Sequence, residues 1–335
     1  MTPRILVLLL VVLLPATGLA QGFRPPPFMA GVPGRAQMQA IEMQRHQART
    51  LLYREALEEI RRNPAVVEVR ECAAGDDEQS LCLPKAAGGG VPAAAAGQPT
   101  ARRIALLVGN FQYRHPIPPL ETPPHDVDRI AAALGRKLGF EVRVLKNATK
   151  ADMVRAVAAL AREVQPADSV FVYYAGHGYL MDDTNMGYWI PVDGSVKTAA
   201  QWISNSDISK LLGAIPARQL MLVSDSCFSG TLAREQSLGG EAAPPGEVLR
   251  KRSVLVLSSG GEEPVSDEGK DGHSIFAWHF LRSLDQLGGT TLGREVFKVV
   301  RKGVSDDFPQ QPQYGAVVSA GHEAGGEYLF EAPAR

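Results

Sequence analysis

From Arg102 onward the chain alternates between short apolar runs and amphipathic stretches, and this alternation limits the folds that it can adopt. The apolar runs have the length of buried strands, and the stretches between them repeat apolar residues at helical spacing. Strands that alternate with helices form mainly parallel sheets with helices on both faces, so we predict an α/β fold. The predicted strands are 104–108, 140–145, 169–173, 219–223 and 253–257, and the predicted helices are 125–138, 151–164, 206–212 (with Ser206 as its cap), 274–284 and 292–300.

The part of the chain before Arg102 has a different composition. Residues 1–20 have the pattern of a cleavable secretory signal, with Arg4, an apolar run over 5–14, and small residues before a cut after Ala20. An apolar run of this length is about half of what a membrane-spanning helix needs, so an uncleaved anchor is the less favoured alternative. We therefore expect a secreted or periplasmic protein without a stable membrane anchor. The expected organisation is a signal over 1–20, a proline-rich linker over 21–35, a small appendage with a helix and a disulfide loop over 36–84, an Ala/Gly/Pro linker over 85–101, and the α/β domain over 102–331.

The chain has three cysteines, and their positions indicate two different uses. Cys72 and Cys82 bracket a polar loop and can form a disulfide in an oxidising compartment. Cys227 is then the odd thiol, which is either a reactive residue or a small buried one. No spacing typical of a zinc site is present. The 35 basic and 36 acidic residues nearly balance, so nucleic acid is not an expected partner.

Two turns that follow predicted strands carry the residues best suited to chemistry. One has the sequence Tyr-Tyr-Ala-Gly-His-Gly and includes His177, and the other has the sequence Asp-Ser-Cys-Phe-Ser-Gly and includes Cys227. Each residue lies four positions after the last apolar residue of its strand. Sites in open α/β sheets lie at the carboxyl ends of the strands, and neighbouring strands are about 5 Å apart. If these two strands are neighbours, His177 and Cys227 can meet.

A thiol beside an imidazole can cleave acyl bonds. The thiolate of Cys227 would attack a carbonyl carbon, and His177 would accept the thiol proton and pass it to the leaving amine. The backbone N–H groups of Gly178 and Cys227 are the candidates for an oxyanion hole. A lone Gly-His-Gly is a weak signal, since a single histidine more often fills a structural role. The combination of both turns predicts a cysteine peptidase.

Residues 104–329 also resemble the caspase-like catalytic domain, in particular its bacterial metacaspase or orthocaspase branch. In caspases the histidine comes about fifty residues before the cysteine. The resemblance implies a caspase-like sandwich and a dyad of Cys227 and His177 without an obligatory third side chain, and it does not extend to Cys72 and Cys82. The matching segments are Ala-Leu-Leu-Val-Gly (105–109), Tyr-Ala-Gly-His-Gly (174–178), Tyr-Trp-Ile-Pro-Val-Asp (188–193), Asp-Ser-Cys-Phe-Ser-Gly (225–230) and Gly-His-Ser-Ile-Phe (272–276).

The same resemblance implies a specificity. Metacaspase-like proteins place acidic residues in the S1 pocket, which holds the P1 residue before the cleaved bond, and here Asp225 and Asp126 match those positions. Two carboxylates favour Arg or Lys as P1. The Gln-Ala-Cys motif of eukaryotic caspases, which cut after Asp, is absent. His125 stands where an Asn is usual, and Asp126 has the alternative role of a solvated acid at a helix N-terminus.

Two loops raise questions of regulation. Residues 231–252 are rich in Gly, Pro and Glu and are predicted to be an exposed loop with four basic residues. Caspase relatives are often cut in the equivalent linker, so self-cleavage there is a hypothesis, and an uncut charged loop is the alternative. Some metacaspases require calcium, but the acidic residues here lack the spacing of a calcium loop, so no cofactor or metal is predicted and calcium activation stays open. Those acidic residues are Asp182, Asp183, Asp267, Glu268 and Asp271.

The sequence as a whole predicts an exported cysteine endopeptidase that acts on proteins or peptides with basic P1 residues. Two alternatives remain. One is a different Cys–His acyl hydrolase on the same scaffold, and the other is a catalytically idle interaction module, because fold does not fix function. The presence of both Cys227 and His177 favours the enzyme.

Overall fold

The computed structural model describes residues 67–77, 80–85, 100–181, 184–226, 230–233, 236–237, 245–260 and 269–332. The predicted signal, the proline-rich linker, the N-terminal helix and most of the Ala/Gly/Pro linker lie outside these residues, and so does Cys227. No helix within the described ranges is long and apolar enough to cross a membrane.

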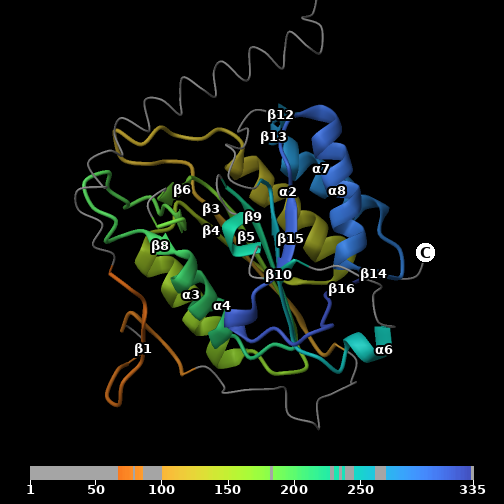
Figure 1. The fold of residues 1–335 in the computed structure, drawn as a ribbon, viewed down its shortest axis with the longest axis horizontal. Helices are drawn as coiled ribbons and strands as arrows, with labels where there is room; N and C mark the ends of the chain where they lie inside the picture. Colours follow the sequence, from red (N-terminus) through yellow and green to blue (C-terminus); the bar gives the residue numbers. More distant parts are fainter. Residues whose placement is uncertain are drawn as a thin grey trace, which may run out of the picture.

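A seven-stranded sheet forms the centre of the protein (Figure 1). The strand order is β10-β15-β11-β9-β5-β3-β4, and the pairs from β11 to β4 are all parallel, whereas β15 runs antiparallel to both of its neighbours. The prediction of a mostly parallel sheet is therefore confirmed. The strands are β3 (Arg103–Gly109), β4 (Glu141–Lys146), β5 (Ser169–Ala175), β9 (Gln219–Asp225), β10 (Gln236–Ser237), β11 (Ser253–Ser258) and β15 (Gln313–Ala316).

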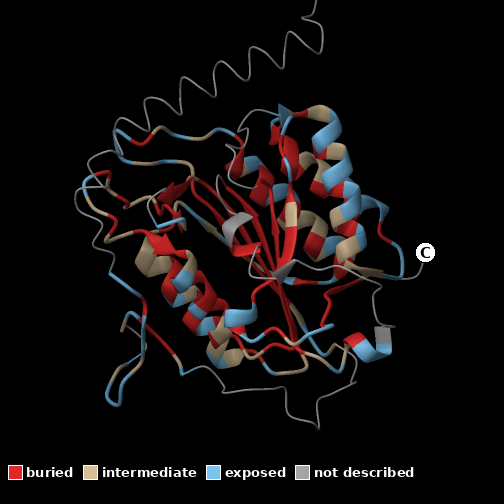
Figure 2. Cartoon of the chain, viewed as in Figure 1, coloured by how far each residue is buried: buried red, intermediate tan, exposed pale blue. Residues whose placement is uncertain are grey.

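Helices cover both faces of the sheet, as predicted. Figure 1 shows α3 (Lys150–Glu163) and α4 (Asn205–Ala214) on one side, and α2 (Pro123–Leu138), α7 (Ile275–Gln286) and α8 (Gly293–Asp307) on the other. Each helix buries its apolar stripe against the strands, so that two apolar clusters sandwich the sheet. In Figure 2 the central strands are buried along their length, and the outer helix faces are exposed.

Several short elements complete the fold. Strands β6 (Gly178–Met181), β7 (Met186–Trp189) and β8 (Ile203–Ser204) form a small antiparallel sheet directly after His177. Two further pairs are β12 (Gly269–Lys270) with β13 (His273–Ser274), and β14 (Thr290–Leu292) with β16 (Leu329–Glu331). The remaining turns of helix are α5 (Gly230–Ala233), α6 (Pro245–Val248) and η2 (Val318–Ala320).

Some predicted helix boundaries are wrong. The last predicted helix ends at Asp307 rather than at residue 300. The third helix begins at Asn205, and its cap is Ser204, whose Oγ accepts a hydrogen bond from the Asp207 N–H at 3.1 Å. The sequence offers three consecutive good capping residues over 204–206, so composition alone cannot choose between them. The choice is made by tertiary structure, because Ser204 is held in the extended backbone of β8, where it pairs with Tyr188 of β7.

The predicted disulfide between Cys72 and Cys82 is present. It closes a short segment in which β1 (Arg70–Glu71) pairs with β2 (Cys82–Leu83). This segment packs on the α/β domain, since Leu83 is buried in the apolar cluster under α3 and α4. The Val69 N–H donates to the buried carboxylate of Asp207 on α4 at 3.0 Å. The segment is therefore attached to the domain by backbone and apolar contacts in addition to its place in the chain.

The prediction that residues 231–252 are simply an exposed loop needs correction. Leu232 is buried, and so is Arg252, which directly precedes β11. The Arg252 guanidinium donates to the carbonyls of Ala217 at 2.7 Å and Ile215 at 2.9 Å. It thereby satisfies carbonyl groups that follow the end of α4, which is why this charged residue is buried.

Candidate active site

The carboxyl ends of β5 and β9 lie side by side at one edge of the sheet. The two strands pair in parallel with Ala175 opposite Asp225, and the Gly176 N–H donates to the Asp225 carbonyl at 3.3 Å. His177 follows the last residue of β5 by two positions, and Cys227 follows the last residue of β9 by the same number. The strand adjacency on which the predicted dyad depends is confirmed. Cys227 itself lies outside the described residues.

Several polar contacts hold His177 in place. Its ring Nε2 lies 2.8 Å from the Pro118 carbonyl, its backbone N–H donates to the Tyr113 hydroxyl at 2.9 Å, and its carbonyl accepts from the Tyr174 hydroxyl at 2.9 Å. The Tyr113 ring also packs against the imidazole, with 4.7 Å between the ring centroids. A carbonyl oxygen can only accept, so Nε2 carries the ring proton. Nδ1 is then the unprotonated nitrogen of the neutral ring, which is the form that a general base needs.

The geometry at Gly178 is compatible with its predicted role in an oxyanion hole. Gly178 opposes Trp189 in the antiparallel β6–β7 pair, and the Ile190 N–H donates to the His177 carbonyl at 3.0 Å. This pattern makes Gly178 and Trp189 a non-hydrogen-bonded pair of the ladder. The β6–β7 ladder therefore does not use the Gly178 N–H.

The two predicted S1 acids come together at Ser274. The Ser274 Oγ donates to Asp225 Oδ2 at 2.6 Å, and the Ser274 N–H lies 3.4 Å from Asp126 Oδ2. The second oxygen of Asp126 lies 2.6 Å from Nδ1 of His273, the residue before Ser274. Acids from α2 and from the end of β9 are thus linked through one hairpin. Sequence reasoning gave His273 and Ser274 no role, although both lie in the quoted Gly-His-Ser-Ile-Phe segment.

The burial of these acids decides between the two interpretations of Asp126, as an acid of the S1 pocket or as a solvated acid at a helix N-terminus. Its side chain is only 1% exposed, and that of its partner His273 is 11% exposed. Asp126 does lie in the first turn of α2, but it is buried rather than solvated, so the alternative of a solvated acid is wrong. Burial raises the pKa of Asp126, and the hydrogen bond from His273 opposes that rise. Asp225 is also buried, two positions before Cys227.

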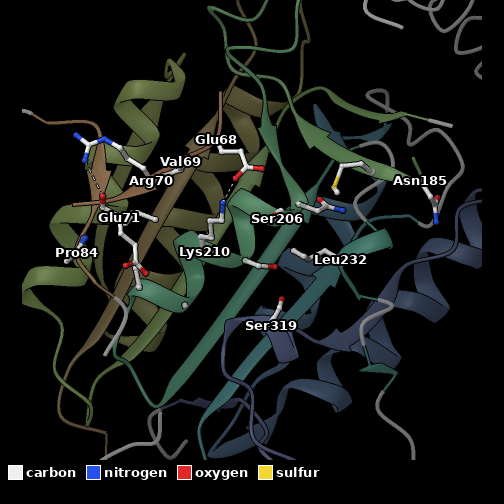
Figure 3. Close-up of a pocket in the computed structure, with 16 residues that line it drawn as sticks. Glu68, Val69, Arg70, Glu71, Pro84, Asn185, Ser206, Lys210, Leu232 and Ser319 are labelled. Atoms are coloured by element: carbon white, nitrogen blue, oxygen red, sulfur yellow. Dashed lines mark hydrogen bonds and ion pairs between the residues drawn. The ribbon is translucent and has the colours of Figure 1, made fainter. Parts of the chain in front are cut away.

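A separate groove of about 860 Å³ lies between the disulfide segment and α4 (Figure 3). Figure 3 shows Glu68, Val69 and Arg70 on one side, with Lys210 of α4 facing Glu68, and the two side chains form an ion pair at 2.8 Å. None of the predicted site residues lines this groove. It is therefore distinct from the predicted catalytic site.

The described residues include one cluster with the composition of a metal site, formed by Cys72, Asp76 and Cys82. Both cysteines are joined in the disulfide, so their sulfur atoms are not available as thiolate ligands. Of the acidic residues considered for calcium, Asp271 lies in the turn between β12 and β13 and accepts a hydrogen bond from Trp278. The other four lie outside the described residues.

Comparisons with known proteins agree with this geometry. A family model of the caspase domain (peptidase C14) matches residues 102–319. Metacaspase-1B of Neosartorya fischeri is 25% identical over 287 residues, which cover 64% of this chain and 69% of that protein. Mucosa-associated lymphoid tissue lymphoma translocation protein 1 of Homo sapiens is 36% identical over 97 residues, which cover 29% of this chain and 11% of that protein. The crystal structure of caspase-1 from Spodoptera frugiperda has a similar fold, with a TM-score of 0.50 and 16% identity over 67% of this chain and 89% of that chain. The chain belongs to the caspase-domain family and is a cysteine endopeptidase.

Proposed function

We propose that this peptidase cleaves after Arg or Lys, with Cys227 as nucleophile and His177 as general base. The observation that carries the specificity is the meeting of Asp126 and Asp225 at Ser274. Asp225 ends the strand that leads to Cys227, so a charge held there is close to the scissile bond. Two carboxylates match the donors of a guanidinium group, which can bind in a bidentate manner. A lysine ammonium would bind with fewer directed contacts.

The proposed reaction needs only the residues of this chain and water. His177 Nδ1 takes the proton from the Cys227 thiol, and the sulfur attacks the carbonyl carbon of the peptide bond. The N–H groups of Gly178 and Cys227 stabilise the oxyanion. When the C–N bond breaks, the imidazolium gives its proton to the leaving amine. Water then attacks the thioester with His177 as base, and the acid product and the thiol are released. This chemistry requires no cofactor, and calcium would act only on the conformation of the protein.

The test uses two peptides that differ only in P1, with a fluorogenic group released after Arg or after Asp. We expect the wild-type protein to hydrolyse the Arg peptide at least about 100-fold more efficiently, because Asp would place a third carboxylate in a buried acidic pocket. Cys227→Ala should abolish the activity. Each reaction is run with calcium and with a chelator, which shows whether the metal is needed. Preferred cleavage after Asp would contradict the acidic S1 pocket but leave the Cys–His chemistry intact.

We also propose that the protein is exported and processes itself within residues 231–252. The apolar run near the N-terminus supports export, and the disulfide between Cys72 and Cys82 fits an oxidising compartment. Arg250 is exposed and is the favoured cleavage site, whereas the buried side chain of Arg252 is engaged by carbonyl groups and cannot enter an S1 pocket.

Intact mass measurement tests both proposals at once. We expect both the wild-type protein and Cys227→Ala to lack residues 1–20 when purified from a secreting host. The wild-type protein should also be cut after Arg250, and Cys227→Ala should stay in one piece. Identical masses for the two proteins would contradict self-processing. Retention of residues 1–20 in both would contradict cleavage of a signal.

A further inference from the structure

Asp126 is a buried carboxylate that must stay charged if it is to attract a basic P1 side chain. A buried carboxyl group without hydrogen-bond donors prefers its neutral form, since removing the carboxylate from water is costly. The residues around it therefore decide its charge. Its shortest contact is from Oδ1 to His273 Nδ1, at 2.6 Å.

The hairpin that carries His273 is built to hold the ring in one place. β12 and β13 are joined by the two-residue turn Asp271-Gly272, and both residues have positive φ, at 55° and 78°. This is the geometry of the tight hairpin turn that an Asp-Gly pair favours. The hairpin is also attached to two helices. Lys270 forms an ion pair with Asp307 of α8 and lies over the Trp278 ring of α7, with 4.5 Å to the ring centroid.

We propose that His273 is a positioning residue of the S1 pocket. By donating its Nδ1–H to the carboxylate, His273 holds Asp126 as an anion beside Ser274, which in turn contacts Asp225. This inference rests on the proposed cleavage after Arg or Lys. A carboxylate anion can only accept hydrogen bonds, so Nδ1 carries the proton whether the ring is neutral or charged. Ser274, the next residue, supplies the N–H to Asp126 and the hydroxyl to Asp225, so one hairpin sets the orientation of both acids.

The inference predicts a loss of discrimination for charge rather than a loss of chemistry. None of the contacts described above joins His273 to His177. In this proposal His273 acts on the substrate only through Asp126. We expect His273→Leu to raise KM for an Arg peptide at least about tenfold, which corresponds to about 1.4 kcal/mol of binding. Its kcat should stay within about threefold. Citrulline has the shape of Arg but no charge, so KM for a peptide with citrulline as P1 should rise much less.

The experiment is a double-mutant cycle on His273→Leu and Asp126→Asn, with KM and kcat measured for the Arg and citrulline peptides. The Arg/citrulline ratio is kcat/KM for the Arg peptide divided by kcat/KM for the citrulline peptide. If His273 acts through the charge of Asp126, removing the histidine in the Asp126→Asn background should change this ratio by less than about twofold. His273→Asn should restore most of the ratio, because its amide N–H can replace Nδ1–H. His273→Ala is a second disruptive variant, for use if His273→Leu does not unfold cooperatively like the wild type.

His279→Asn is the matched control. His279 lies on the neighbouring helix in the same kind of pair, with Nε2 at 2.8 Å from Asp307 Oδ2, but its partner is not an S1 residue. Asp307 also pairs with Lys270 of the hairpin, but that ion pair does not involve His279, so the substitution should leave the Arg/citrulline ratio unchanged. The inference is overturned if the disruptive His273 variants keep the wild-type ratio, or if they change it equally with and without Asp126. A wild-type protein that does not prefer Arg or Lys refutes the proposed function and this inference together, and that result is visible before any His273 variant is measured.

Discussion

Gly176→Ala is expected to reduce kcat by at least about 100-fold, because the new methyl group would displace His177, the proposed general base. A Cβ at this position would lie 2.7 Å from the hydroxyls of both Tyr113 and Tyr174. These are the two hydroxyls that hold the backbone N–H and carbonyl of His177. Tyr174 cannot yield, since it is fully buried and stacked on Trp189 with 4.3 Å between the ring centroids. The strain therefore falls on the chain at His177, and a misplacement of about 1 Å in a catalytic group can cost about 100-fold in rate.

The measurement combines peptide hydrolysis with the rate of Cys227 alkylation. With Cys72 and Cys82 in a disulfide, Cys227 is the one thiol of the chain. In the proposed dyad, its reactivity reports how well His177 favours the thiolate. We expect Gly176→Ala to slow both rates. Gly135→Ala is the control, since its Cβ would have only ordinary contacts, of 3.6 Å to Val142 and 3.8 Å to the Phe140 carbonyl. In the interior of α2 it should stabilise the fold by up to about 1 kcal/mol and leave activity unchanged. Wild-type alkylation and turnover in Gly176→Ala would contradict the steric argument.

The sheet and its site could be predicted because their signals are local and regular. Five apolar runs separated by amphipathic stretches require a mostly parallel sheet, and such a sheet brings the residues that follow its strands to one edge. This was sufficient to place His177 and Cys227 at the same edge of the sheet, each directly after the end of a strand. The prediction still needed β5 and β9 to be neighbours, and sequence pattern alone does not give strand order.

The groups that orient the site were not predictable in the same way. Pro118 contributes a backbone carbonyl, which every residue has, so no side-chain pattern marks it. Tyr113 acts through a turn after β3 whose path depends on tertiary packing. For His273 a signal did exist, since it stands beside the helix cap Ser274, in the Gly-His-Ser-Ile-Phe segment on which the family resemblance partly rested. Its role follows only from the burial of Asp126, which the sequence left open between a solvated acid and a pocket acid.

Asp225→Asn is expected to lower kcat/KM for the Arg peptide by about 100-fold or more, the largest effect on specificity that we predict. Removing one partner of a buried, hydrogen-bonded charge pair costs about 2–5 kcal/mol. The amide keeps the volume of the carboxyl group, and its oxygen can still accept from the Ser274 hydroxyl, so the strand end should keep its structure. For the citrulline peptide, kcat/KM should fall far less, because its P1 side chain brings no charge to the pocket. Thermal unfolding of the variant checks that the fold is intact.

Asp128→Asn separates the charge of the pocket from the charge of the protein. Asp128 lies two residues after Asp126 on α2, but its side chain is 61% exposed and pairs with Lys146. Both substitutions remove one negative charge, so a general electrostatic attraction for basic peptides would weaken similarly in the two variants. A local S1 contact predicts that only Asp225→Asn changes the Arg/citrulline ratio. If Asp225→Asn lowers kcat/KM equally for both peptides, Asp225 acts on the position of Cys227, two residues away. Recognition of the P1 charge then belongs to other residues.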